Sequence, residues 1–190
     1  MIETWSFGGK KIVEAWVPNR DDWVPRLLDE FDANRKSIER SHKIGGRWEN
    51  SYLPVDLVPS IREPMRFVRH IGKEELGVTS VILFEPLSRS PNSHPPFWFN
   101  LARPGERTGL HDHVDLSRLS AVTYLACDEN SGNLYFRMDG EDDLEISPEV
   151  GKVVIFDPAL WHGVHENRSD SERISFAFNL FPFPLPTEEI

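Results

Sequence analysis

Residues 173–181 read Arg-Ile-Ser-Phe-Ala-Phe-Asn-Leu-Phe, and from Arg173 to Leu180 polar or small residues alternate with large apolar ones. Successive side chains on a strand point to opposite faces of a sheet, so this order predicts a strand with two different faces. The inward face would carry four polar or small residues: Arg173, Ser175, Ala177 and Asn179. The other face would carry four apolar residues: Ile174, Phe176, Phe178 and Leu180. We expect the apolar face to pack against a covering helix.

Similar short apolar runs occur upstream and are separated by turn residues. The expected strands span residues 80–84, 97–102, 119–126, 133–137, 152–156, 163–166 and 173–181. Turn signals such as Pro104-Gly105, Asp139-Gly140 and Asp157-Pro158 fall between them. Short strands at this spacing predict an antiparallel sandwich or barrel, and therefore a mainly β (α+β) fold.

The first third of the chain has the pattern of helices. One helix should be capped by Asn19 or Asp21 and end at Gly45-Gly46, with apolar residues at helical spacing: Trp23, Leu27, Leu28, Phe31 and Ile38. A second helix is expected around residues 58–72. We therefore expect a single domain, 1–190, with helical support at about 1–77, a strand-rich core at about 78–181 and a proline-rich tail at 182–190.

Composition narrows the classes of partner. The 190 residues carry a formal net charge of −10, which opposes general binding to nucleic acid or an anionic membrane. Cys127 is the single cysteine, which excludes an intrachain disulfide and fits a reducing compartment. We expect a cytoplasmic protein that acts on a small molecule or a peptide, in an oligomeric state that the sequence leaves open.

Two histidines and a carboxylate are spaced so that they could share one metal ion. His113 and Asp115 would share a face at a strand end, and His162 would come from a neighbouring strand. Two imidazoles and one carboxylate form the facial triad of non-haem Fe(II) oxygenases, which leaves positions open for substrates. His113, Asp115 and His162 are therefore the expected metal ligands and catalytic residues.

His111 provides an alternative ligand. His111-Asp112-His113 has the same two-residue spacing, so His111, His113 and His162 could form a three-histidine site. We favour Asp115 because it supplies an anionic ligand. In that arrangement, His111 would lie behind the ligands or face the substrate.

An acidic co-substrate has a candidate anchor in Arg173 and Ser175. A guanidinium holds a carboxylate through two parallel hydrogen bonds, and a nearby hydroxyl adds a third. This pair suits the distal carboxylate of 2-oxoglutarate. Asn100, on the strand that enters the site, is a further candidate contact to the co-substrate or substrate. The arginines near the metal loop could bind an acidic substrate, although exposed loop arginines usually bind none: Arg103, Arg107 and Arg118.

Residues 97–181 resemble the superfamily of 2-oxoglutarate- and Fe(II)-dependent dioxygenases. Residues 104–109 before His113-Val114-Asp115 are similar to the approach to the metal in prolyl hydroxylases, and residues 131–136 resemble a Gly-Gly-x-Leu-x-Phe segment. Residues 151–156 with His162-Gly163-Val164 resemble the second-histidine region, and Arg173-Ile174-Ser175 matches an Arg-x-Ser anchor. The His-Asp-His run and the Arg-Ile-Ser-Phe-Ala-Phe-Asn ending are closer to a branch that carries a His-x-His pair.

The resemblance implies a double-stranded β-helix (jelly roll, cupin-like) with the N-terminal helices on one sheet. It implies Fe(II), 2-oxoglutarate and dioxygen, with ascorbate as an optional reductant. The expected reaction hydroxylates an unactivated C–H bond and releases succinate and carbon dioxide. Two alternatives remain: a three-histidine cupin-type dioxygenase that needs no 2-oxoglutarate, and a non-catalytic cupin-like binding module. The role of residues 1–96 is left open.

Overall fold

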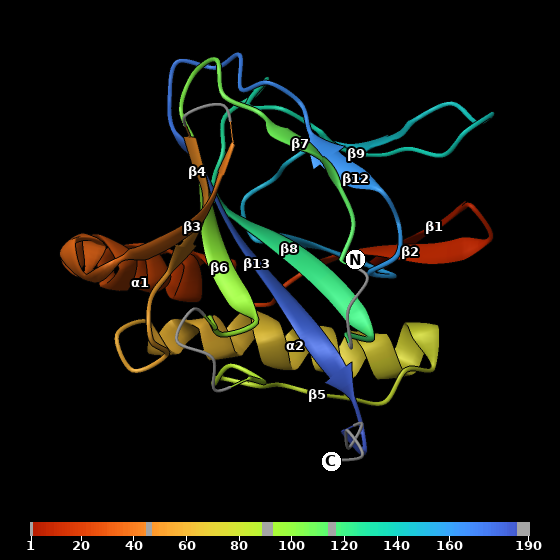
Figure 1. Cartoon of the computed structure of the whole chain (residues 1–190), viewed down its shortest axis with the longest axis horizontal. Helices are drawn as coiled ribbons and strands as arrows, with labels where there is room; N and C mark the ends of the chain where they lie inside the picture. The colour runs from red at the N-terminus through yellow and green to blue at the C-terminus, as the bar shows by residue number, and fades with distance from the viewer. Residues whose placement is uncertain (1, 45–46, 89–92, 114–116, 186–190) are drawn as a thin grey trace.

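The computed structural model describes residues 2–44, 47–88, 93–113 and 117–185. These residues form two antiparallel sheets, one of nine strands and one of four (Figure 1). The mainly β architecture expected from the strand spacing is confirmed. None of the helices in the described ranges is long and apolar enough to cross a bilayer.

The larger sheet contains the strand on which the sequence pattern is clearest. Its strands run in the order β1 (Ile2–Phe7), β2 (Lys10–Trp16), β11 (Lys152–Phe156), β8 (Leu119–Ala126), β13 (Arg173–Pro182), β6 (Phe97–Ala102), β4 (Arg47–Tyr52) and β3 (Glu39–Ile44). A short strand, β5 (Ser80–Val81), pairs with the end of β13. β13 lies between β8 and β6, at the centre of the sheet.

The smaller sheet consists of β10 (Leu144–Ile146), β9 (Leu134–Phe136), β12 (His162–Val164) and β7 (Thr108–His111), in that order. A cavity lies between the two sheets. It is lined from the large sheet by residues that include Asn100, Ser120 and Ser175, and from the small sheet by Thr108 and His162. We call this space the inner cavity.

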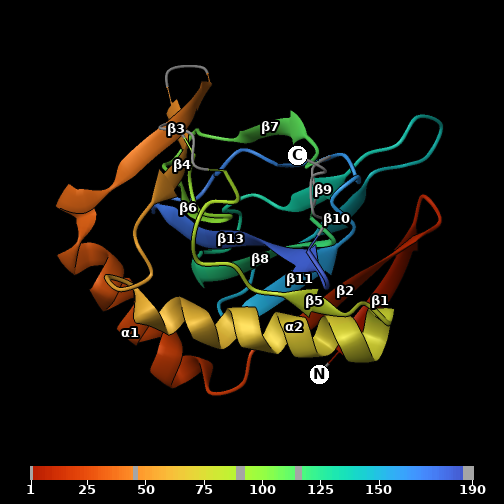
Figure 2. The ribbon, with the colours of Figure 1, turned by 60° about the horizontal axis from the view of Figure 1, so that its bottom comes forward.

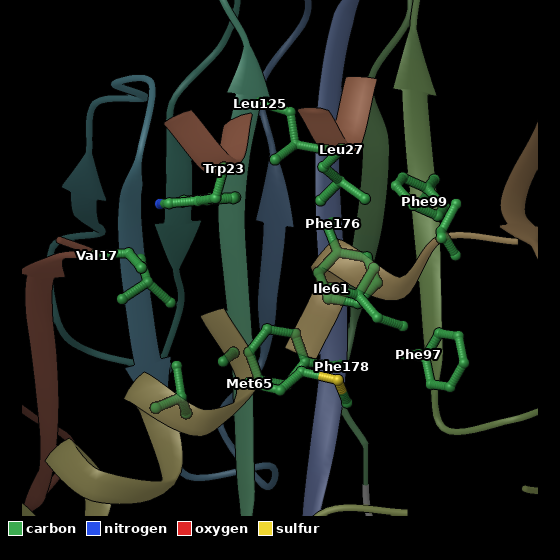
Figure 3. Packing of buried hydrophobic residues seen from close by; sticks show 14 of the residues in the cluster. Val17, Trp23, Leu27, Ile61, Met65, Phe97, Phe99, Leu125, Phe176 and Phe178 are labelled. Atoms are coloured by element: carbon green, nitrogen blue, oxygen red, sulfur yellow. The ribbon is translucent and has the colours of Figure 1, made fainter. Parts of the chain in front are cut away.

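Two helices cover the outer face of the large sheet, on the side away from the small sheet (Figure 2). They are α1 (Arg20–Ala33) and α2 (Arg62–Leu76), and the short 3₁₀ turns η1 (Arg35–Ser37) and η2 (Pro59–Ile61) lie between them in the chain. Their apolar residues pack on the sheet, with Trp23, Leu27 and Met65 close to Phe176 and Phe178 (Figure 3). Burying a phenylalanine ring contributes about 1.5–3 kcal/mol, so this layer is a major source of stability.

The predicted faces of residues 173–181 are confirmed. All four apolar residues of the set (Ile174, Phe176, Phe178 and Leu180) lie in the core cluster under the helices. Ser175, Ala177 and Asn179 line the inner cavity on the opposite side. β13 extends one residue further than expected, because Pro182 pairs with Ser80 at the end of the sheet.

The expectation that residues 1–77 form helical support is wrong in part. Helix α1 ends at Ala33 rather than near Gly45-Gly46, and residues 39–44 form a strand. Asn19 occupies the N-cap position, but its side chain makes no capping hydrogen bond; its backbone carbonyl accepts from Asp22 and Trp23. The second helix begins and ends later than the expected range of 58–72.

Four strands of the first third were not expected. β1 and β2 form a hairpin in which Phe7 pairs with Lys10, so Gly8 and Gly9 are the two turn residues. Both have positive φ, 55° and 70°, as a tight hairpin turn requires. β1 and β3 are edge strands that are exposed at nearly every position, so neither buries one face and hydrophobic periodicity gives little signal there. β7 and β10 are too short to give a pattern.

Candidate active site

Strand pairing brings three histidines together at the end of the small sheet. His111, the last residue of β7, pairs with His162 of β12. His113 follows two residues later, and its backbone N–H donates to the carbonyl of Pro158 over 2.9 Å. One ring nitrogen from each histidine lies within 4.8 Å of the others. In the described part of the chain, these residues form a group that can hold a metal ion.

Backbone carbonyls determine which ring nitrogen faces a metal. Nδ1 of His162 lies 2.8 Å from the carbonyl oxygen of Leu160, and Nδ1 of His111 lies 2.8 Å from that of Gly109. A carbonyl only accepts hydrogen bonds, so both Nδ1 atoms carry the proton. The lone pair of each ring is therefore on Nε2. Metal-binding histidines usually donate their other N–H to such a partner.

The environment also favours neutral imidazole at His162. Its side chain is buried, with 5% exposure, and burial holds its pKa well below the usual value. The nearby rings of His111 and His113 lower the pKa further. A histidine must be deprotonated to bind a metal, so this site is ready for a cation at neutral pH.

The predicted triad is described in part. His113 and His162 lie together as expected, whereas Asp115 falls outside the described residues. His111, predicted as the alternate ligand, completes the group of three. The spacing of the sequence did not separate these two possibilities, because the choice depends on where β7 ends and how it pairs with β12.

Arg173 provides an unsatisfied buried cation. Its side chain is 1% exposed, and Nη1 donates to the carbonyl oxygens of Ser131 and Gly132. Nε and Nη2 have no hydrogen-bond partner in the described structure. Burial lowers the pKa of the guanidinium from its usual value. An unpaired buried charge costs several kcal/mol, so this arrangement favours a bound anion.

Three hydroxyl groups share this lack of partners. Tyr124 Oη, Thr108 Oγ1 and Ser131 Oγ are all buried without a hydrogen bond among the described residues. Tyr124 is paired in register with Ser175 on β13, and the charge of Arg173 acts on its hydroxyl. Burial raises the pKa of Tyr124, so the group is a neutral donor. An arginine and several hydroxyls fit a carboxylate of a 2-oxo dicarboxylic acid.

A glycine leaves space for this arginine. Gly132 has φ 99°, and a Cβ there would lie 2.7 Å from Arg173 Nη1 and 2.2 Å from the carbonyl oxygen of His165. Any side chain would therefore displace the guanidinium. Thr108 gave no signal in the sequence, because a polar residue on a short strand has no distinctive pattern.

Asn100 lines the inner cavity, but its side chain already has partners. Its Oδ1 accepts from Arg47 Nη2 over 2.6 Å, and its Nδ2 donates to the carbonyl of Glu49 over 2.9 Å. Arg47 also donates to the carbonyls of Leu101 and Arg107. Asn100 therefore connects the cavity wall to strand β4. Sequence reasoning did not single out Arg47.

The loop arginines lie away from the histidines. Arg103 is exposed and lies 3.9 Å from Glu172. Among the described residues that line the inner cavity, there is no lysine or arginine, so Arg103, Arg107 and Arg118 are not part of its wall.

Part of the chain matches a known protein family. Residues 96–179 match the family model described as "Putative 2OG-Fe(II) oxygenase", and this segment contains the three histidines and Arg173. No curated protein sequence matches the chain.

Solved structures share the fold at low sequence identity. The α-ketoglutarate-dependent carbocyclase SnoK from nogalamycin biosynthesis is 14% identical, with a TM-score of 0.67 over 90% of this chain and 79% of that one. A prolyl-4-hydroxylase from Pseudomonas putida is 16% identical, with a TM-score of 0.60 over 90% and 92%. The epimerase SnoN, solved with Fe³⁺, α-ketoglutarate and nogalamycin RO, is 14% identical, with a TM-score of 0.65 over 90% and 78%.

These structures confirm the double-stranded β-helix. Residues 96–179, which contain the three histidines and Arg173, are in addition similar in sequence to the 2OG-Fe(II) oxygenase family.

Proposed function

We propose that this protein hydroxylates a C–H bond of an organic substrate, with 2-oxoglutarate as co-substrate and His111, His113 and His162 as the iron ligands. Two observations together carry this proposal: three converging imidazoles that line the inner cavity, and a buried arginine with unsatisfied N–H groups on β13, the strand whose Ser175 lines the same cavity. One dioxygen would give one oxygen atom to the substrate and one to succinate, with release of carbon dioxide. Iron and 2-oxoglutarate supply the oxygen activation and the two electrons.

The histidines would present their Nε2 atoms to the metal. The carbonyls of Leu160 and Gly109 hold the rings of His162 and His111 in the required tautomer. Apolar residues beside the histidines exclude water; the ring of Phe156 packs edge-on against His162 at a centroid distance of 4.6 Å. A dry, fixed site protects reactive chemistry from side reactions.

Arg173 would bind the far carboxylate of 2-oxoglutarate. Its free Nε and Nη2 groups can donate two hydrogen bonds, and the hydroxyls of Tyr124 and Thr108 can add others. Ser175, which lines the inner cavity on the same strand, is the expected further donor. This anchor orients the 2-oxo acid end of the molecule toward the histidines.

The second candidate is a dioxygenase that uses the three histidines without 2-oxoglutarate. The all-histidine group supports it. The unpaired N–H groups of Arg173 favour the 2-oxoglutarate-dependent reaction, because a dioxygenase without 2-oxoglutarate would not need a buried anion site.

The test is succinate formation from 2-oxoglutarate by protein loaded with Fe(II), with ascorbate present. We expect slow turnover without primary substrate in the wild type. Replacing Arg173 with Gln removes charged hydrogen bonds, each worth about 1.5–3 kcal/mol, so the 2-oxoglutarate requirement should rise roughly tenfold or more. Arg103→Gln, at an exposed loop, is the matched control. If the wild type and Arg173→Gln require the same 2-oxoglutarate concentration, Arg173 does not anchor the co-substrate.

A further inference from the structure

A second and larger cavity lies on the outer side of the histidines. It measures about 550 Å³, within the size range of small-molecule sites. Its walls come from the β3–β4 hairpin, residues 86–88 and 93–96, and Trp98 of β6. His111 and His113 line both this outer cavity and the inner cavity. A molecule held here would therefore lie beside the proposed metal.

The hairpin wall is held by a hydrogen-bond network. Ser41 Oγ lies 2.6 Å from His42 Nδ1 and 3.0 Å from Tyr52 Oη. Asn50 Nδ2 lies 3.3 Å from the same Nδ1 and donates to Tyr52 Oη over 3.0 Å. An amide N–H only donates, so His42 Nδ1 accepts. The neutral ring therefore carries its proton on Nε2, which leaves an N–H donor on a residue that lines the outer cavity.

The backbone at His42 is also unusual. Its φ is 57°, a left-handed conformation within strand β3. Such a conformation costs a non-glycine residue on the order of 1 kcal/mol, and strain of this kind concentrates at binding sites. The side-chain network around His42 compensates for that cost and fixes the imidazole at the cavity wall.

Aromatic rings and prolines form much of the remaining wall of the outer cavity. The rings of Tyr52 and His94 stack at a centroid distance of 4.1 Å with an interplanar angle of 8°. Trp98 lies with its ring 5.5 Å from that of His113. Pro86, Pro95 and Pro96 also line the cavity. Aromatic and proline surfaces of this kind pack well against a ring.

Charge limits the class of ligand. The described residues that line the outer cavity include the carboxylates of Glu49 and Asp112 but no lysine or arginine. Glu49 pairs with Arg47 at 3.3 Å, whereas Asp112 forms no ion pair within the described part of the chain. An anionic substrate would meet a carboxylate without a compensating cation.

We propose that the outer cavity is the primary-substrate site and that it binds a neutral or cationic, ring-bearing small molecule. The ring packs against Trp98, and His42 and Asn50 bind its polar substituents. The contribution of His42 and Asn50 to specificity therefore comes from the N-terminal hairpin, outside the segment that matches the family, whereas Trp98 and Asp112 lie within that segment. This inference rests on the proposed function, because it assigns the substrate of the same iron site.

The test uses protein loaded with Mn(II) and 2-oxoglutarate, and measures how strongly the paramagnetic ion relaxes the protons of three probes. Tyramine, tyrosol and p-hydroxyphenylacetate share a phenol ring and are cationic, neutral and anionic. We expect strong relaxation of tyramine and tyrosol and weak relaxation of the anion. Equal or stronger relaxation of the anion, or no relaxation of any probe, would overturn the inference.

Substitutions in the outer cavity test which side chains bind the probes. Asp112→Asn should lower the preference for tyramine over tyrosol by roughly two- to fivefold, as expected for one partly solvated ion pair. His42→Asn tolerates the left-handed backbone and removes the imidazole, so it should weaken both probes. Arg103→Gln should leave the relaxation of all three probes unchanged. If His42→Asn binds both probes as the wild type does, the hairpin does not determine specificity.

The same samples distinguish a failure of the proposed function from a failure of the substrate inference. Relaxation of the protons of 2-oxoglutarate by Mn(II) tests the proposed function alone. If 2-oxoglutarate is not relaxed, the proposed function fails. If 2-oxoglutarate is relaxed and the probes behave otherwise than expected, the substrate inference alone fails.

Discussion

At the scale of single residues, the site depends on which atoms lack partners. The carbonyls of Leu160 and Gly109 take the Nδ1 protons of His162 and His111, so both Nε2 atoms are left for a metal. Arg173 places two N–H groups in the protein interior without acceptors. Without a ligand, the Nε2 lone pairs and the N–H groups of Arg173 lack partners. A metal ion would bind the former and a carboxylate the latter.

The ligand set can be decided by three substitutions. We expect His111→Ala and His162→Ala to lose Fe(II) binding, because each removes one of three converging nitrogens. Asp115→Ala should still bind iron. Metal analysis after anaerobic loading gives the stoichiometry, and circular dichroism checks the fold. If Asp115→Ala loses iron and His111→Ala retains it, the ligands are instead His113, Asp115 and His162.

Cys127 should be a slow nucleophile. Burial raises the pKa of its thiol to about 11, so the protonated form dominates below that pH. The thiolate is the reactive form, and its share should therefore be small at pH 8 and increase as the pH rises toward 11. Alkylation rates with iodoacetamide, compared with free cysteine across this range, check the expectation. A rate at pH 8 equal to that of free cysteine would contradict it.

At the scale of elements, β13 shows what the sequence can predict. The alternation of residues 173–181 predicted both faces correctly, because every second side chain is buried under the helices. The hairpins of the first third were not predicted. Their strands are half-exposed, and β2 and β4 pair with β11 and β6, which lie far along the chain. Pairing between strands that lie far apart in the chain cannot be predicted from the local sequence.

The two faces of β13 should respond differently to substitution. Phe176→Ala removes a fully buried ring and should lower the free energy of unfolding by about 3–5 kcal/mol. Ser175→Ala, one residue away and facing the inner cavity, should leave stability nearly unchanged and raise the 2-oxoglutarate requirement. Urea unfolding and succinate assays measure the two effects. Equal destabilisation by both variants would contradict the assignment of the faces.

The sequence named candidate residues for the site but not how they meet in space. His113, His162, Arg173 and Ser175 were all identified from spacing, and the structure places the two histidines together and Ser175 on the inner cavity. The contributions of Tyr124, Thr108 and Gly132 depend on close approach between strands. Spacing along one strand does not encode such contacts.

At the scale of the whole molecule, the N-terminal segment does more than cover a sheet. It supplies both helices of the outer layer and strands at both ends of the large sheet (Figures 1 and 2). Its β3–β4 hairpin also forms a wall of the outer cavity beside the histidines. The family-matching segment thus holds the proposed metal and co-substrate sites, and the preceding segment shapes the space in front of them.

The most direct test of the central claim is anaerobic addition of 2-oxoglutarate to the Fe(II)-loaded protein, followed by visible absorption. Chelation of Fe(II) by a 2-oxo acid gives a charge-transfer band. We expect this band in the wild type, its loss in His162→Ala, and a higher 2-oxoglutarate concentration for half-saturation in Arg173→Gln. Iron binding without the band would contradict the 2-oxoglutarate assignment and favour the three-histidine dioxygenase. Binding of neither iron nor 2-oxoglutarate would leave only a binding module.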